Sequence, residues 1–108
     1  MKKQNISDMW GGWFIGDFDP SVLKTKEFEV GVLTRSKGLD ETPHYHAIGT
    51  EYNVLLSGSM TLNDELINVG DIFIIKPNQI ARPVFHEDCQ VLCVKTPSVP
   101  GDKHSVRD

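Results

Sequence analysis

Apolar and polar residues alternate in short runs along most of this chain. A period of two places successive side chains on opposite faces of a β-strand, and the runs are rich in the β-branched and aromatic residues that strands favour. The pattern predicts strands at residues 13–15, 28–34, 44–46, 51–56, 59–62, 65–69, 72–76, 82–86 and 90–95. Residues 20–25 could form one helical turn, and no other segment shows a 3.6-residue apolar period. We therefore expect an all-β fold.

Turn-forming residues separate these runs. They occur at Lys37-Gly38, Ile48-Gly49, Ser57-Gly58, Asn63-Asp64, Gly70-Asp71 and Pro77-Asn78. Short strands with turns at this regular spacing are typical of a β-sandwich or a β-barrel.

The chain has 108 residues, which is the size of one domain. We assign residues 1–108 to a single domain with a barrel core at about 28–96, an N-terminal strand segment at 8–18 and a C-terminal arm at 97–108. The arm is rich in proline and charge, so we expect it to be irregular and to pack on the barrel or on a neighbouring chain.

The net charge of −4 and the pI near 5.5 argue against nucleic acid or an anionic membrane as the partner. No apolar stretch approaches the roughly 20 residues that span a bilayer, and the N-terminus lacks the apolar core of a signal peptide. Cys89 and Cys93 would lie about 13 Å apart on a strand, too far for a disulfide. We expect two buried thiols and a cytoplasmic protein.

His44, His46 and Glu51 form the most informative group of polar residues. On a strand the two histidines face the same way, about 7 Å apart. A tight turn at residues 47–50 would then bring Glu51 back beside them. Two imidazoles and a carboxylate on one face are ligands that iron, nickel, zinc or manganese accepts.

The spacing around these residues resembles the first motif of the cupin superfamily, G-x5-H-x-H-x(3,4)-E-x6-G. Gly38, His44, His46, Glu51 and Gly58 occupy every fixed position of this motif. The resemblance implies a small jelly-roll β-barrel and covers roughly residues 28–96.

The second cupin motif, G-x5-P-x-G-x2-H-x3-N, matches this chain less well. Gly70 begins it, but Lys76 stands in the proline position and Asn78 in the glycine position. Ala81 replaces the histidine and Phe85 the asparagine. Alanine cannot serve as a metal ligand, so the fourth ligand of the family site is missing.

The resemblance leaves three hypotheses open, and whether the chain is an enzyme stays open with them. In the first, His44, His46 and Glu51 hold a divalent metal that acts on a small polar metabolite, such as a sugar derivative or a carboxylate. In the second, His44 and His46 act as acid and base without metal, as in the jelly-roll (RmlC-like) sugar-nucleotide isomerases and epimerases. In the third, the barrel only binds a ligand or a partner.

Three further residues are candidates for a substrate pocket. Asn53 shares the inward parity of Glu51, and Phe85 is expected on the inner face. Arg82 follows the empty histidine position and could reach an acidic group at the mouth. Lys95 shares the parity of Cys93 and could also point inward.

The N-terminal run Trp10-Gly-Gly-Trp13 is apolar. In cupins such a segment commonly adds to the sheet of a partner chain, so the resemblance implies a homodimer formed through an edge strand.

Overall fold

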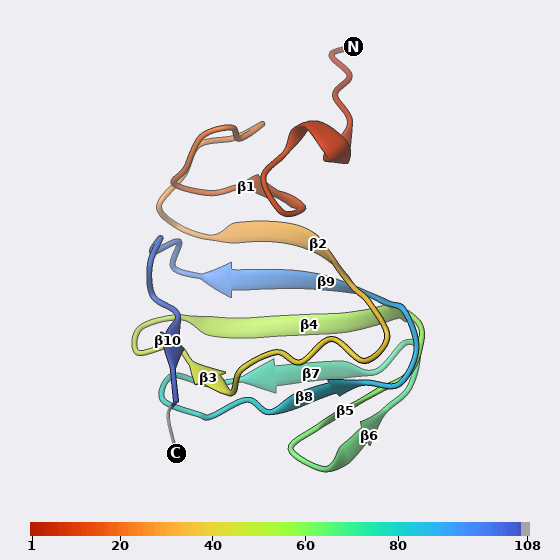
Figure 1. Ribbon diagram of the computed structural model, residues 1–108. Coiled ribbons are helices and arrows are strands. Elements are labelled where there is room, and N and C mark those ends of the chain that lie inside the picture. Colours follow the sequence, from red (N-terminus) through yellow and green to blue (C-terminus); the bar gives the residue numbers. More distant parts are fainter. Residues whose placement is uncertain (107–108) are drawn as a thin grey trace.

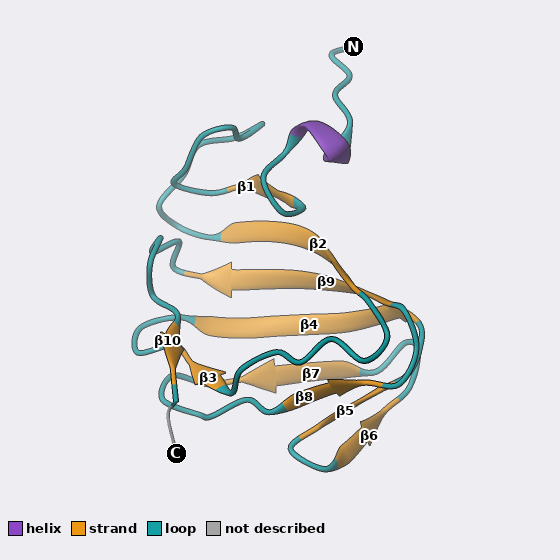
Figure 2. Ribbon diagram, in the orientation of Figure 1, coloured by secondary structure: helices purple, strands orange, loops and turns teal. Residues whose placement is uncertain are grey.

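The computed structural model describes residues 1–106, and almost all of their regular structure is β (Figures 1 and 2). One 3₁₀ turn, η1, spans Ile6–Asp8. The strands are β1 Trp13–Ile15, β2 Glu29–Arg35, β3 His44–Tyr45, β4 Thr50–Ser57, β5 Met60–Leu62, β6 Glu65–Ile67, β7 Ile72–Ile75, β8 Pro83–Phe85, β9 Cys89–Thr96 and β10 His104–Ser105. The nine strands predicted from the sequence all form, each shifted by no more than two residues at either end. No helix in this part of the chain is long and apolar enough to cross a membrane.

Two layers of antiparallel strands face each other, as a jelly roll requires. The first layer is a five-stranded sheet in the order β1-β2-β9-β4-β7. The second combines the three-stranded sheet β6-β5-β8 with the pair β10-β3. Backbone hydrogen bonds between His44 and Ala81, 3.1 and 2.8 Å long, connect these two smaller sheets. The all-β jelly-roll prediction is confirmed, although the sheets do not join into one continuous barrel.

In the large sheet, the pairing between strands places the inward side chains in rows across the strands. The polarity of these rows changes from one end of the strands to the other. The first row holds Glu29, Lys95, Glu51 and Ile75; the second holds Gly31, Cys93, Asn53 and Phe73; the third holds Leu33, Val91 and Leu55. The inner face therefore grades from charged at one end to apolar at the other.

The apolar end forms the core. Its buried cluster contains Leu55, Met60, Ile67, Phe85, Cys89 and Val91. Burying each of the large side chains contributes on the order of 2 kcal/mol. Both cysteines are buried free thiols, as expected. Gly58, the last residue of the first motif, has φ +91°, and a Cβ there would collide with the carbonyl oxygen of Asp88.

The N-terminal segment extends the large sheet of its own chain. β1 pairs with β2 through Trp13 and Gly31. The helical turn expected at residues 20–25 is absent, because this stretch is also bound to β1. The N–H of Val22 donates to the carbonyl of Phe14 at 2.8 Å, and the N–H of Gly16 donates to Leu23 at 3.1 Å.

The C-terminal arm is more regular than its composition suggested. β10 pairs with β3 and so lies across one end of the layers (Figure 1). The Asp102 carboxylate accepts the backbone N–H groups of Ala47, Ile48 and Gly49 at 2.9, 3.0 and 2.8 Å. These three residues form the turn between β3 and β4, so the arm holds the connection between His46 and the next strand. Residues 107–108 of the predicted arm lie outside the described residues.

Asp102 gives a stability prediction that depends on pH. Burial alone would raise the pKa of Asp102, but the three N–H donors outweigh it and hold this pKa below its ordinary value. The stabilisation is therefore present above the unfolded-state pKa near 3.8 and is lost as pH falls through the lower folded-state pKa. Asp102→Asn should lower the free energy of unfolding by about 2 kcal/mol at neutral pH.

The measurement is urea denaturation of both proteins between neutral and acidic pH, where the difference should shrink below about pH 4. Asp71→Asn is the matched control, since exposed Asp71 accepts a single N–H, from Asn68 at 2.8 Å. An equal loss in the two variants would contradict the assignment to the three-donor turn.

Candidate active site

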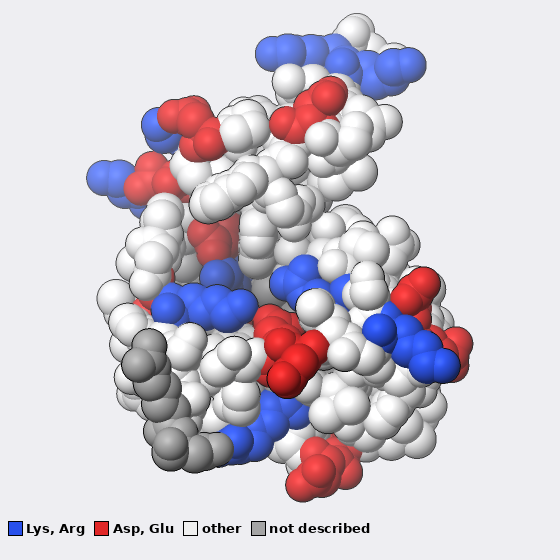
Figure 3. Space-filling model, in the orientation of Figure 1, with Lys and Arg blue, Asp and Glu red and all other residues white. Residues whose placement is uncertain are grey.

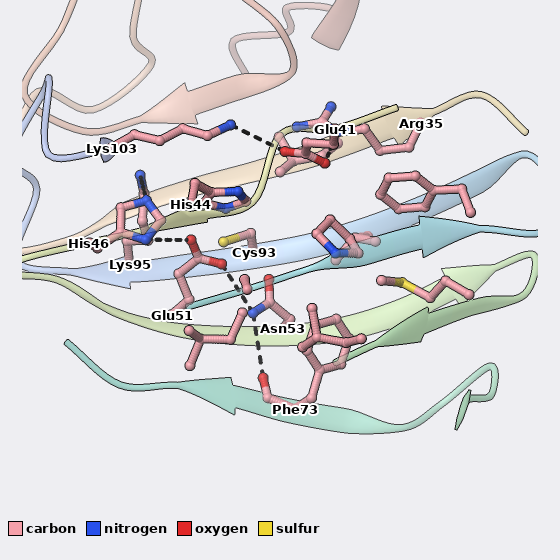
Figure 4. Close-up of a pocket in the computed structure, with 18 of the residues that line it drawn as sticks. Arg35, Glu41, His44, His46, Glu51, Asn53, Phe73, Cys93, Lys95 and Lys103 are labelled. Atoms are coloured by element: carbon pink, nitrogen blue, oxygen red, sulfur yellow. Dashed lines mark hydrogen bonds and ion pairs between the residues drawn. The ribbon is translucent and has the colours of Figure 1, made fainter. Parts of the chain in front are cut away.

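A cavity of about 160 Å³ lies between the two layers. Polar side chains from separate elements line its charged end, where His44 and His46 meet Glu51, Asn53 and Lys95 (Figure 4). The expected ligand residues His44, His46 and Glu51 therefore converge, together with Asn53, at the charged end of the register rows.

Local backbone structure explains the orientation of the histidines. Both have the same strand parity, and their rings lie edge to face with centroids 5.7 Å apart. His44 Nδ1 lies 3.2 Å from the carbonyl oxygen of Thr42, which fixes that ring. His46 follows the end of β3, but its carbonyl accepts the N–H of Asn78 at 2.7 Å. Both side chains are buried as a result.

His46 is engaged at both ring nitrogens. Its Nδ1 lies 3.1 Å from Oε2 of Glu51, and its Nε2 lies 3.5 Å from the Nζ of Lys95. These partners assign the neutral tautomer in which Nδ1–H donates to the carboxylate and Nε2 is left as an acceptor facing the ammonium. Burial lowers the pKa of His46 below 6.5, and the nearby Lys95 and His44 lower it further against the opposing effect of Glu51.

Lys95 is a nearly buried cation that contacts the carboxylate of Glu29 and the indole ring of Trp13. Its Nζ lies 2.8 Å from Oε1 of Glu29, and Oε2 of Glu29 accepts the hydroxyl of Ser98 at 2.8 Å. The same Nζ sits 4.9 Å from the centroid of the Trp13 ring, a cation–π contact. A Cβ on Gly31 would lie 2.7 Å from that ring, so the indole needs a glycine beneath it.

Two of the predicted pocket residues line the cavity. Asn53 is buried, and its amide donates to Oε1 of Glu51 at 3.3 Å and to the carbonyl of Phe73 at 3.5 Å. Phe85 faces the cavity and also belongs to the core cluster. Asn53 thus helps to orient the carboxylate that holds His46.

The structure does not bring Arg82 together with the other predicted pocket residues. Ala81 is buried in the cavity wall, at 2% exposure, so strand alternation turns the next residue outward. Arg82 is exposed and does not belong to the cavity lining within residues 1–106.

Several lining residues escaped the sequence analysis. Arg35 has the inward parity of Leu33 and could have been found from strand alternation. Trp13 was assigned only to an edge strand that would pair with a partner chain. Glu41 and Lys103 lie outside the strands, in segments without periodicity, and no local signal marks them.

The donor set does not fit a metal ion. Within the described residues, no three His, Cys, Asp or Glu side chains are arranged to hold one. The ammonium of Lys95 faces His46 Nε2, where it would repel a cation, and Glu51 bonds to the other ring nitrogen. Ala81 adds no ligand at the fourth position. Metal binding by His44, His46 and Glu51 therefore stays a prediction from the motif.

The contacts of His46 with Lys95 and Glu51 can be tested through the pKa of His46, which should shift in opposite directions when each partner is removed. Lys95→Met removes a charge that lowers the pKa of His46 and should raise that pKa, whereas Glu51→Gln removes a charge that raises it and should lower it further. Histidine NMR titration measures both changes. The exposed His104 in the same spectra serves as the internal control. Shifts of the same sign in the two variants would contradict the arrangement.

Comparison with known proteins leads to solved structures only. No protein-family model and no curated protein matches the chain. A double-stranded β-helix protein from Klebsiella pneumoniae is 24% identical with a TM-score of 0.68, over 81% of this chain and 76% of that one. The polyketide cyclase RemF from Streptomyces resistomycificus is 21% identical with a TM-score of 0.65, over 78% and 63% of the two chains.

A third similar structure is described as a cupin protein, and cupins are the superfamily that the sequence motif resembles. It is a cupin-2 domain protein from Shewanella frigidimarina, 15% identical with a TM-score of 0.55, over 69% of this chain and 76% of that one. At sequence identities below 25%, the likeness of these structures shows a shared fold only. The chain has the double-stranded β-helix fold of the cupins.

Proposed function

We propose that the cavity binds a small organic molecule and catalyses proton transfer on it, with His46 as the acid–base group and without a metal. The observation that carries this proposal is the pairing of both ring nitrogens of His46, with Glu51 on one side and Lys95 on the other. A carboxylate that fixes the tautomer of a neutral imidazole prepares the other nitrogen to accept a proton.

The roles of the three side chains follow from their positions. Glu51 keeps the proton on Nδ1, and the lowered pKa of His46 keeps the ring neutral at pH 7. A substrate proton is taken by Nε2, which Lys95 contacts only at 3.5 Å in the free protein. The ammonium then stabilises the negative charge that develops on a neighbouring substrate oxygen. This suits the removal of a proton from a carbon next to a carbonyl group.

Enzyme activity has a precedent on this fold, since RemF is a polyketide cyclase. The substrate we propose is a small metabolite, a sugar derivative or a carboxylate.

The alternative, a metal-dependent enzyme, is favoured by the motif spacing of His44, His46 and Glu51, but it requires Lys95 to leave His46 Nε2. In a non-catalytic binding protein, the ligand would occupy the same cavity, and the contacts of His46 with Glu51 and Lys95 would not be required.

Metal analysis separates these hypotheses. The wild-type protein, purified without chelator, should hold no stoichiometric iron, nickel, zinc or manganese, and these ions should not raise its Tm. The double variant Lys95→Ala/Ala81→His removes the ammonium and adds an imidazole, so it should gain a metal site. At 100 times the Kd, zinc would then stabilise it by about 2.7 kcal/mol.

The controls are the two single variants, and the readouts are elemental analysis and thermal denaturation. One equivalent of metal in the wild type, with a higher Tm, would overturn the metal-free proposal in favour of the metalloenzyme. Once a substrate is known, His46→Gln should abolish turnover while EDTA leaves the wild-type rate unchanged. Turnover that survives His46→Gln would overturn the assignment of His46 as the acid–base group.

We also propose that the chain forms a homodimer. The outward positions of β2, β4, β7 and β9 carry no charged residue, and Ile72 and Ile74 on β7 are 72% and 51% exposed. Tyr52 lies beside Ile74 in the register, so the apolar surface continues across strands. A flat apolar sheet face can pack against an identical copy around a twofold axis. This face replaces the edge strand as our proposed contact, since β1 is paired with β2.

Ile74→Asp should convert the dimer to a monomer, because it would bury a charge between the two sheets. Light scattering after gel filtration measures the mass. Val84→Asp is the control, since Val84 is 50% exposed on the other layer. A wild-type protein that is monomeric throughout would contradict the proposal.

A further inference from the structure

Three charged side chains meet at the mouth of the cavity. Glu41, in the segment between β2 and β3, lies between Arg35 of β2 and Lys103 of the C-terminal arm (Figure 4). Its Oε2 is 3.5 Å from Nε of Arg35, and its Oε1 is 3.2 Å from Nζ of Lys103. Acidic and basic side chains accordingly gather around the hollow below the N-terminal segment (Figure 3).

The charges of this cluster do not balance. Two cations share a single carboxylate, and that carboxylate is well shielded, with 16% of its side chain exposed. Deeper in the cavity, Lys95 is paired with Glu29, and Glu51 keeps its negative charge beside the neutral His46. The cluster at the mouth by itself therefore carries one more positive than negative charge. It lies next to a wall of low polarity, where its two cations attract an anion strongly.

The space behind the mouth limits what that anion can carry. The cavity measures about 160 Å³, and its far end is apolar, formed by Leu33, Met60, Phe85 and Val91. An apolar protein cavity of about this size accommodates one benzene ring. The cavity thus has room for a single ring or a short branched chain beside one anionic group.

We propose that the ligand is a compact monocarboxylate with one ring or a short branched chain, and that its carboxylate displaces Glu41 from Arg35 and Lys103. Glu41 then acts as an internal competitor that closes the mouth of the free protein. The arrangement requires the ligand to be an acid, because a neutral molecule gives the two cations no replacement for the carboxylate they lose. This inference names the substrate class of the function proposed above and rests on the same cavity.

The probe is benzoate, and the matched neutral probe is benzamide. Binding is measured by calorimetry and by NMR on the full chain in the presence of EDTA. Glu41→Gln removes the competing charge and should tighten benzoate binding by about tenfold while leaving benzamide unchanged. Asp40→Asn is the matched control: it removes the same charge from an exposed neighbouring residue and should change neither affinity.

The cations give the complementary test. Arg35→Met should weaken benzoate binding by about tenfold, since it removes a guanidinium that can bind a carboxylate. Lys103→Met should also weaken benzoate binding. Because the Lys103 side chain is 52% exposed, this substitution should leave the fold intact. Arg82→Met is the control, at an exposed residue outside the cavity wall, and should have no effect.

Unchanged or weaker benzoate binding in Glu41→Gln overturns the proposal. Equal tightening of benzamide also overturns it, because the mouth would then open without regard to charge. An absence of benzoate binding at millimolar concentration in both wild type and Glu41→Gln rules out this ligand class. EDTA keeps these results separate from the metal test, so either proposal can fail while the other stands.

Discussion

The ammonium of Lys95 is the charge around which the inner face is organised. An ion removed from water costs several kcal/mol unless partners replace its hydration. Here Glu29 pairs with it on the adjacent strand, the Trp13 ring covers it, and His46 lies beside it. These partners come from β2, from β1 and from the residue after β3, so neutralising one cation ties together three parts of the fold. Gly31 takes part indirectly, by leaving room for the indole.

The same cation decides which chemistry the motif residues can perform. A tethered ammonium beside His46 Nε2 supplies a fixed positive charge at the point where the cupin motif leads one to expect a metal. It also favours a neutral imidazole, which can act as a base. Away from this charge, the small residues Cys93 and Ala81 leave space, and the wall becomes apolar toward Val91. A ligand is thus held with its reacting group at one end and its apolar body at the other.

Much of the fold could be predicted because its signals are local. The alternation of apolar and polar residues located nine strands, because successive side chains of a strand point to its two opposite faces. β10, with two residues, is too short to show any period, and it forms because Asp102 anchors the arm to the turn at Ala47 and Gly49. That contact joins residues more than 50 positions apart, a distance at which no periodicity connects them. The helical turn expected at residues 20–25 failed for a related reason, because pairing with β1 overrode local preference.

The sequence by itself determined that His44, His46 and Glu51 would face one another, because strand parity and a short turn leave the chain little choice. Arg82 was placed at the mouth only because it follows the empty histidine position, whereas its neighbour Ala81 takes the inward position. Tertiary structure decided the rest, above all that Lys95 stands beside the imidazole. Its position depends on the register between separate strands, which is set by packing and by charge pairing across the sheet. The motif thus fixed which groups meet, while the register placed an ammonium among them and set the chemistry they can perform.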